Sequence, residues 1–245
     1  MMAVVGATAI GAVQRQARER RIFTGMAMLI ATTVIGGFGS FALRGMVDVA
    51  KVPWWVYVHA LSLIIWTLLF LAQALLILRG RADVHRQLGW VAGALACFIV
   101  PWGIATSILA VQMGRVPPFF TPGVFLLLGP LDMLAFAGLT MAAVLLRNRS
   151  DWHKRLMLCG TIAMLEPAFG RILPMPLLGA WAGASATLMQ LLYVGLAMHG
   201  DVRMGKAVHP AYVWGMAVIV ARCVLVEVLG HMQVAASTAA ALMAG

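Results

Sequence analysis

Seven long apolar runs follow one another along the chain, separated by short polar segments. They cover residues 22–44, 54–78, 88–112, 120–146, 156–172, 177–198 and 210–232. Each run is close to the roughly 20 residues that a helix needs to cross a hydrocarbon core about 30 Å thick. The pattern predicts an all-α polytopic membrane bundle of seven transmembrane helices. This domain, residues 22–232, follows a basic N-terminal segment (1–21) and precedes an Ala-rich tail (233–245).

Two of the polar segments share a motif. Residues 81–89 read Arg-Ala-Asp-Val-His-Arg-Gln-Leu-Gly, and residues 149–157 read Arg-Ser-Asp-Trp-His-Lys-Arg-Leu-Met. Each motif lies between two apolar runs and places a histidine, His85 or His153, at the boundary with water. The recurrence indicates a tandem repeat of two helical hairpins, 54–112 and 120–172, related by an axis along the membrane normal.

Composition supports the membrane assignment. The chain is 62% hydrophobic and only 11% charged, whereas soluble domains are about 25% charged. The formal net charge of +10 comes from basic residues between the apolar runs, without a nucleic-acid-binding motif, so nucleic acid is not an expected partner.

The basic residues also predict the orientation. Four precede the first run, three lie in the first motif segment, four in the second and two before the last run, thirteen of the eighteen. By the positive-inside rule these segments are cytoplasmic, which predicts the N-terminus inside and the C-terminus outside.

The stretch from His59 to Arg171 resembles a family of uncharacterised multi-pass bacterial membrane proteins. The matching positions are His59, Gln73, the segment His85-Arg86-Gln87-Leu88-Gly89, the segment His153-Lys154-Arg155-Leu156-Met157, and Arg171. Leu88 and Leu156 stand where the family commonly has tryptophan. The resemblance implies a helical protein of the bacterial inner (cytoplasmic) membrane and supplies no activity.

Five ionisable residues fall inside the apolar runs, where a charge requires a partner or a function. They are Asp132, Glu166, Arg171, Arg222 and Glu227. One interpretation is structural pairing, for example of Asp132 with Arg222 or Arg171. The other is a proton or solute pathway through Asp132, Glu166 and Glu227, or an anion held by the arginines.

The histidines offer candidate ligands. Glu227 and His231 are four residues apart on one helix face and, with His59, form a candidate metal site. His59 and His231 are alternatively axial ligands of one haem. At the inner surface, His85 and His153 are stronger candidates than His199 and His209, which are expected to cap helix ends. The structural alternatives are that His231 is an exposed rim residue and that His59 forms a hydrogen bond at a helix interface.

Three functions remain open on this reasoning. The first is redox or electron transfer at haem b or a transition metal, with His59, His85 and His153 as candidate ligands and Arg171 and Arg222 as partners of an anion or of haem propionates. Quinone or other membrane subunits are partners in that case, besides the lipid bilayer. The second is a small-solute or proton transporter, and the third is a non-catalytic accessory subunit of a larger membrane complex. No nucleotide-binding or serine-hydrolase motif is present, and the sequence leaves open whether the protein is an enzyme.

Overall fold

The computed structural model describes the backbone of residues 2–244 and the side chains of residue 11 and residues 14–244. Within these residues the chain is helical and contains no strand, which confirms the all-α expectation. The helices are α1 (Met2–Leu43), α2 (Trp54–Leu78), α3 (Ala82–Gln112), α4 (Pro122–Leu145), α5 (Ser150–Ala163), α6 (Glu166–Ile172), α7 (Met175–Leu178), α8 (Ala182–Val202), α9 (Pro210–Gly230) and α10 (Gln233–Ala244), with 3-10 turns at Val49–Lys51 and Gly179–Trp181.

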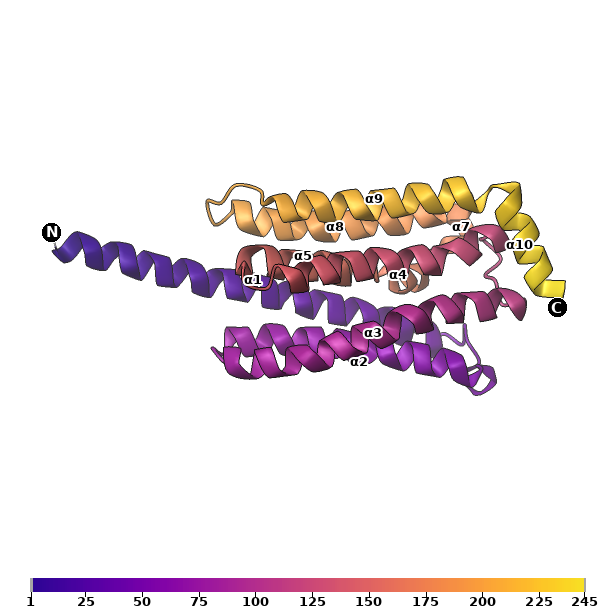
Figure 1. Cartoon of the computed structure of the whole chain (residues 1–245), viewed down its shortest axis with the longest axis horizontal. Coiled ribbons are helices and arrows are strands. Elements are labelled where there is room, and N and C mark those ends of the chain that lie inside the picture. Colours follow the sequence, from indigo (N-terminus) through magenta and orange to yellow (C-terminus); the bar gives the residue numbers. More distant parts are fainter. Residues whose placement is uncertain (1, 245) are drawn as a thin grey trace.

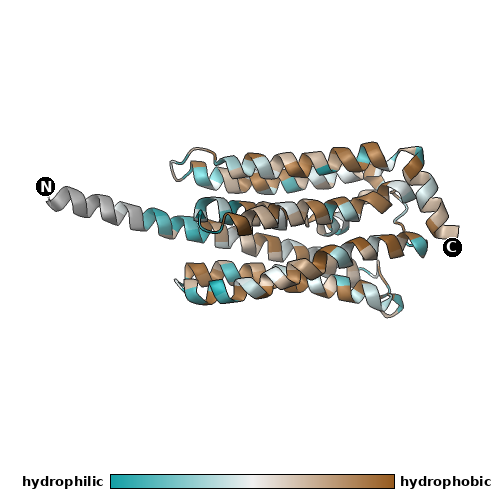
Figure 2. Cartoon of the chain, viewed as in Figure 1, coloured by the Kyte–Doolittle hydropathy of each residue, from teal (hydrophilic) through white to brown (hydrophobic). Residues whose placement is uncertain are grey.

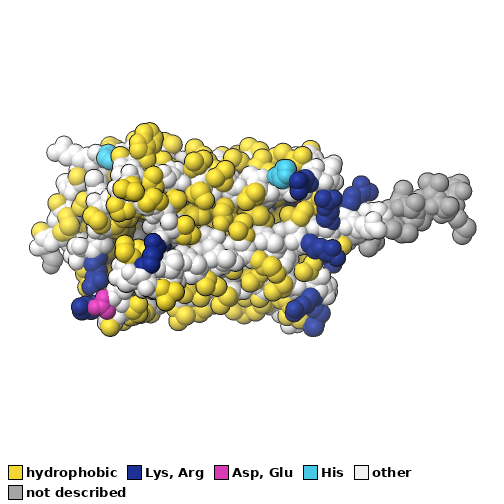
Figure 3. Space-filling view, turned by 180° about the vertical axis from the view of Figure 1, so that it is seen from behind, with side chains coloured by type: hydrophobic (Ala, Val, Ile, Leu, Met, Phe, Trp, Pro, Cys, Tyr) yellow, Lys and Arg dark blue, Asp and Glu magenta, His cyan; other side chains and the backbone are white. Residues whose placement is uncertain are grey.

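The long helices run side by side as one elongated bundle (Figure 1). In the described part of the chain, six helices are long and apolar enough to cross a membrane. Hydrophobic residues occupy the length of the bundle while hydrophilic residues gather near its ends (Figure 2). On the face shown in Figure 3, most lysine and arginine side chains likewise lie toward the two ends. Leucine and isoleucine side chains such as Leu61, Ile65 and Leu134 are exposed along the bundle, as lipid contact requires. The protein is therefore a multi-pass integral membrane protein.

The fifth apolar run is not one helix, in contrast to the sequence expectation. It forms α5 and α6, separated by Met164 and Leu165. Pro167 explains the break, because its nitrogen has no hydrogen to donate to the carbonyl of Ala163 and its ring collides with that carbonyl in a regular helix.

The two pieces nevertheless extend between opposite ends of the bundle. Near the start of α5, Arg155 contacts Asp201 at the end of α8. Near the end of α6, the carbonyl of Arg171 accepts a hydrogen bond of 2.9 Å from Arg44, just after α1. We use these contacts to name the Arg155 end and the Arg171 end of the bundle.

The flanking segments are more ordered than the apolar pattern indicates. The tail forms α10, which packs on α3 and α4 and buries Ala235 and Ala239. Helix α1 continues without interruption from the basic segment into the first apolar run. Of the expected N-terminal segment 1–21, the side chains of residues 1–10, 12 and 13 lie outside the described residues. The first motif is also helical, since α3 begins at Ala82 rather than near 88.

Small residues allow the helices to approach closely. A methyl group at Gly37 of α1 would lie 2.9 Å from the carbonyl oxygen of Ala168 in α6. A methyl group at Gly215 of α9 would lie 2.4 Å from the sulfur of Cys159 in α5. Such contacts are the usual basis of helix association in a membrane. The glycines of the first apolar run do not act together, because Gly36 and Gly39 have open space around them.

Candidate functional site

The break between α5 and α6 exposes backbone groups in the middle of the bundle. The carbonyl of Ala163 lacks its usual partner because Pro167 has no N–H, whereas the carbonyl of Ile162 accepts a hydrogen bond of 3.0 Å from the backbone nitrogen of Leu165. The amide nitrogen of Gln190, on α8, donates to both, at 3.3 Å and 2.8 Å. Gln190 is fully buried, and its side chain replaces the hydrogen bond to Ala163 that Pro167 cannot donate. The backbone carbonyls at the break therefore have hydrogen-bond partners within the fold.

Arg222 of α9 lies directly beside this break and organises the polar core. Its Nε atom is 3.1 Å from Oδ1 of Asp132 on α4, an ion pair without the alignment of a hydrogen bond. Its Nη1 atom donates to Oε2 of Glu166, the first residue of α6. Its Nη2 atom donates to Oε1 of Gln190 at 2.8 Å and to Oγ1 of Thr187 at 3.3 Å. Four groups from three helices thus converge on the guanidinium of Arg222. We call Asp132, Glu166, Thr187, Gln190 and Arg222 the Arg222 cluster.

The charges of the Arg222 cluster do not balance. Two carboxyl groups face a single guanidinium, and all three side chains are at most 7% exposed. Oε1 of Glu166 has no hydrogen-bond partner in the part of the chain that the structure describes. An uncompensated charge in a dry interior is strongly unfavourable. The geometry therefore favours one additional positive charge, such as a proton, on this cluster.

Glu227 lies between the Arg222 cluster and the Arg171 end. It follows Arg222 by five residues on α9, and its charge is close enough to interact with that of Glu166. Its side chain is 40% exposed, so it reaches the edge of the bundle while Glu166 remains inside. The three carboxylates of the predicted proton or solute pathway thus form a sequence from the buried core to the surface.

His231 lies beside Glu227, with 3.7 Å between its Nδ1 atom and Oε2 of that residue, as the four-residue spacing predicts. Its Nδ1 atom lies 2.8 Å from the backbone carbonyl of Glu227, and its side chain is 58% exposed. His59 lies on α2 and faces Gly103 of α3. Among the described residues, no group of three His, Cys, Asp or Glu side chains is close enough to hold one metal ion. The described residues thus do not gather His59, Glu227 and His231 into one group of three ligands.

Arg171 and Arg222, proposed together as anion partners, have different surroundings. Arg222 is occupied by internal carboxylates, which supports the pairing interpretation. Arg171 instead stacks on Phe38 of α1, with 4.0 Å from the guanidinium carbon to the ring centroid, and donates to the carbonyl of Pro167 at 2.7 Å. It lies near enough to His59 for an electrostatic interaction. The two arginines therefore do not form one anion site.

His85 and His153 are brought together, as the repeated motif suggested. Their ring centroids are 6.3 Å apart near the Arg155 end. His59 is 14 residues before Gln73 on the same helix, and Gln73 lies beside His85, so His59 is about 20 Å away along α2 at 1.5 Å per residue. His59 therefore lies far from the His85–His153 pair.

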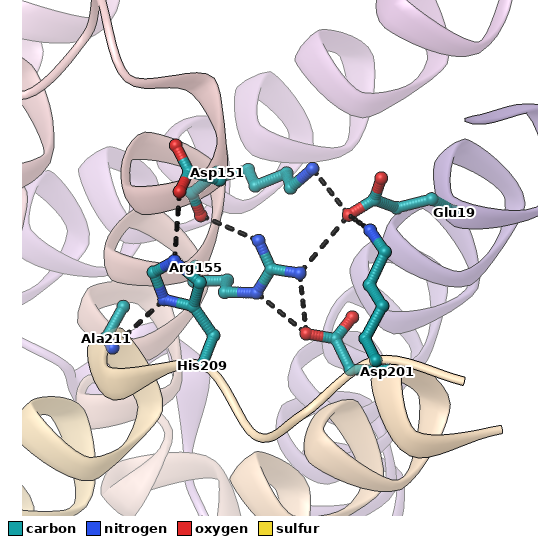
Figure 4. Close-up of polar contacts among 8 residues, drawn as sticks. Glu19, Asp151, Arg155, Asp201, His209 and Ala211 are labelled. Carbon is teal, nitrogen blue, oxygen red and sulfur yellow. Dashed lines mark hydrogen bonds and ion pairs between the residues drawn. The ribbon is translucent and has the colours of Figure 1, made fainter. Parts of the chain in front are cut away.

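A second ion-pair cluster at the Arg155 end did not follow from the sequence. Arg155 is 2% exposed and donates through Nε and Nη2 to Oδ2 of Asp201 at 2.8 Å and 2.5 Å. Oε1 of Glu19, on α1, lies 3.2 Å from Arg155, 2.5 Å from Lys154 and 2.8 Å from Lys206 (Figure 4). We call these five residues the Arg155 cluster. The sequence offered one signal, namely that Glu19 and Asp201 are acidic residues in otherwise basic segments.

His209 caps α9, as expected for a histidine at a helix end. Its Nδ1 atom accepts a hydrogen bond from the backbone nitrogen of Ala211, so its Nε2 atom carries the hydrogen and donates to Asp151 at 3.0 Å (Figure 4). This hydrogen bond lowers the pKa of the Asp151 carboxyl. Asp151 consequently orients His209 and not the adjacent His153.

The comparisons with known proteins yield no relative: no family model, no curated protein and no solved structure matches the chain. The functional argument therefore depends on the geometry of the sites.

Proposed function

We propose that this protein is a membrane transporter that moves protons, alone or coupled to a small solute, through the Arg222 cluster. The observation that carries the proposal is the placement of Arg222 between two buried carboxyl groups at a break in a membrane helix. Binding and release of one proton changes the cluster between neutral and singly negative. A buried group that changes charge in this way is suited to carry protons or to couple their movement to another solute.

The helix break supports the same interpretation. Transporters commonly place their substrate and ion sites near the bilayer midplane, where discontinuous helices provide polar groups. Here Glu166 begins α6 immediately after the break, and Gln190 joins the freed carbonyl of Ala163 to Arg222. A movement of α6 relative to α5 therefore changes the position of Glu166 next to Arg222.

The topology that accompanies this proposal has seven crossings. The fifth is the pair α5–α6, because its two ends contact opposite ends of the bundle. We place the Arg155 end in the cytosol, because thirteen basic residues lie there, and the C-terminus outside. With this orientation, Glu227 connects the Arg222 cluster to the outer surface. The resemblance noted above favours a bacterial cytoplasmic membrane.

Proton occupancy of the cluster is tested directly by infrared spectroscopy of the purified full chain at neutral pH. We expect a carbonyl band from a protonated carboxyl group, lost or shifted in Asp132→Asn or in Glu166→Gln. Asp48→Asn is the matched control, because Asp48 is an exposed carboxylate paired with Lys51 outside the bundle. A spectrum in which neither core substitution changes a protonated-carboxyl band contradicts proton binding by the cluster.

Transport is tested in liposomes that contain a trapped pH-sensitive dye. Under an imposed potassium diffusion potential, we expect a proton flux with the wild-type protein and with Asp48→Asn. The flux should fall by about 100-fold or more in Asp132→Asn and Glu166→Gln, because a positioned proton-transfer group typically contributes about 10²–10⁴-fold to a rate. Equal flux in core variants and control, in folded protein, would exclude the Arg222 cluster as the pathway.

Redox chemistry at a haem is the alternative, and the adjacent pair His85–His153 is the observation that favours it. An absorption spectrum of the purified protein distinguishes the two functions. A dithionite-sensitive Soret band that disappears in His153→Ala supports haem. A colourless protein with a proton flux supports transport.

A further inference from the structure

An apolar groove runs along the outside of the bundle where α4 and α9 lie against α5. These helices pack against one another and leave a volume of about 500 Å³ between them. The buried side chains of Leu139 and Leu156 form its floor, and the exposed side chains of Leu134 and Trp214 form its rim. The volume is within the roughly 300–1,000 Å³ of ligand pockets in proteins. We call it the α4–α9 groove, and its lining includes no residue of the Arg222 cluster.

The α4–α9 groove covers the depth of one membrane leaflet. Between Leu134 and Leu146, the first and last lining residues on this segment, the chain rises by about 18 Å at 1.5 Å per residue. One leaflet contributes about half of a hydrocarbon core roughly 30 Å thick. Leu134 follows the buried Asp132 by two residues, and Leu146 ends α4 at the Arg155 end. The groove therefore has the length and the apolar lining that suit a lipid acyl chain in the leaflet at that end.

The end of the groove nearest the surface of the membrane is basic. Arg147 and Arg149 lie in the short connection between α4 and α5, beside Trp152, which lines the groove. Both arginines are exposed, and neither forms an ion pair with a carboxylate of the described residues. The nearby acidic residue Asp151 is paired with His209 at 3.0 Å. Tryptophan commonly lies at the level of lipid headgroups, so the two guanidinium groups are at the depth of a phosphate.

The charge also distinguishes a lipid from a second copy of the chain. Two copies that meet in one membrane through the same surface are related by a twofold axis along the membrane normal, so identical residues lie at the same depth. Arg147 and Arg149 of both copies would then face each other, and like charges repel. A phospholipid with a negatively charged headgroup instead places its phosphate beside the arginines and its acyl chain on the apolar floor.

We propose that the α4–α9 groove binds one anionic phospholipid of the leaflet at the Arg155 end. An acyl chain of the lipid lies along α4, and its phosphate is held by Arg147 and Arg149. A guanidinium group suits this role, because its N–H groups form paired hydrogen bonds with phosphate oxygens. Basic sites between membrane helices bind anionic headgroups in this way. With the orientation proposed above, this leaflet is the cytoplasmic one.

The headgroup contact is tested by native mass spectrometry of the delipidated full chain, titrated in detergent with phosphatidylglycerol or with phosphatidylcholine of the same acyl chains. We expect one phosphatidylglycerol to bind at least about fivefold more tightly than phosphatidylcholine. Arg149→Gln should weaken its binding about fivefold and Arg147→Gln/Arg149→Gln about 25-fold, since one basic residue near an anionic lipid contributes about fivefold. Arg86→Gln is the matched control and should bind as the wild type, because Arg86 is an exposed arginine on α3, outside the groove.

The acyl-chain contact is tested by filling the groove. Gly138 lines it, is exposed, and has open space where a side chain would begin. Gly138→Leu should therefore fold and should lose the tight phosphatidylglycerol site. Gly36→Leu is the control, since Gly36 is an exposed glycine of α1 that also has open space around it. Phosphatidylglycerol with a photoreactive group in its acyl chain should label residues 134–146 in the wild type and not in Gly138→Leu.

Wild-type affinity in folded Gly138→Leu or in Arg147→Gln/Arg149→Gln overturns the proposal, as does equal binding of the two lipids. A dimer that dissociates in Gly138→Leu while lipid binding is unchanged assigns the groove to a second copy and overturns it as well. Asp132→Asn should bind phosphatidylglycerol as the wild type does. Failure of the proton site and failure of the lipid site are therefore distinguishable.

Discussion

Arg155 and Arg222, the two arginines whose side chains are almost fully buried, each lie between two carboxylates from different helices. Arg222 contacts Asp132 and Glu166, and Arg155 contacts Glu19 and Asp201. These four carboxylates are half of the eight acidic residues in the chain. The difference between the clusters is their charge. Lys154 and Lys206 belong to the Arg155 cluster and give it a net positive charge. Such a cluster suits a permanent link between α1, α5 and α8. In the part of the chain that the structure describes, no further cation joins the Arg222 cluster, which suits reversible proton binding.

The permanent link can be tested by comparing neighbours. Arg155→Met leaves Asp201 buried and unpaired, and removal of one partner of a buried ion pair typically costs about 3–5 kcal/mol. Lys154→Met removes a cation that contacts the same Glu19 oxygen as Arg155. The Lys154 side chain is 29% exposed, so we expect the free energy of unfolding to fall by about 1 kcal/mol or less. Unfolding of both variants in detergent, followed by circular dichroism, measures the difference. Equal losses would show that burial of Arg155 does not determine the strength of the link.

The sequence predicted one ion pair of the Arg222 cluster but not the Arg155 cluster, and the reason is physical. Helix rise alone puts Asp132 and Arg222 near mid-membrane, so their pairing was a stated interpretation and is confirmed. The partnership of Glu166 depends on the helix break and could not be found from depth. Arg155 looked like one of many basic boundary residues, because its burial depends on the positions of Glu19 and Asp201, far away in the sequence.

At the scale of the helices, the apolar pattern located most elements closely. Helix α2 has the expected bounds, and the bounds of α4 and α9 differ from expectation by at most two residues. The fifth run was wrong as a single helix, although Pro167 carried the signal in the sequence. Hydropathy does not detect such a break, because Met164 and Leu165 at the break are as apolar as a continuous helix would be. Only the missing hydrogen-bond donor of proline distinguishes the two cases.

The contact between α1 and α6 depends on one glycine. A methyl group at Gly37 would collide with the Ala168 carbonyl, whereas Gly36 has open space around it. We expect Gly37→Ala to destabilise the protein by roughly 1–3 kcal/mol, the usual cost of overpacking. Gly36→Ala should be neutral or slightly stabilising, because alanine favours the helix. Thermal unfolding of the two variants in the same detergent provides the comparison. A destabilised Gly36→Ala with an unaffected Gly37→Ala would place the α1 interface on the wrong face.

For the whole molecule, the sequence established the class of architecture better than the number of crossings. Length and hydropathy determine which segments enter the bilayer, and the protein is a helical membrane bundle as expected. Counting crossings requires knowing whether the broken pair α5–α6 traverses the membrane. The tandem repeat 54–112 and 120–172 depends on the same pair, and it stays a prediction. The meeting of His85 with His153 shows that the two copies of the motif lie at the same end of the bundle.

The crossing of α5–α6 can be determined with single cysteines in a background from which Cys97, Cys159 and Cys223 have been removed. We expect Arg149→Cys, before α5, to react with a membrane-impermeant maleimide only in inside-out vesicles. Leu177→Cys, after α6, should react only in right-side-out vesicles, and this leucine is exposed. Arg86→Cys and Lys51→Cys are the controls for the two faces, since Arg86 lies in the first turns of the unbroken helix α3 and Lys51 lies just before α2. Labelling of positions 149 and 177 from one side would mean six crossings, with both termini on the same side. Glu227 would then no longer connect the Arg222 cluster to the outer surface, because α9 would run in the opposite direction.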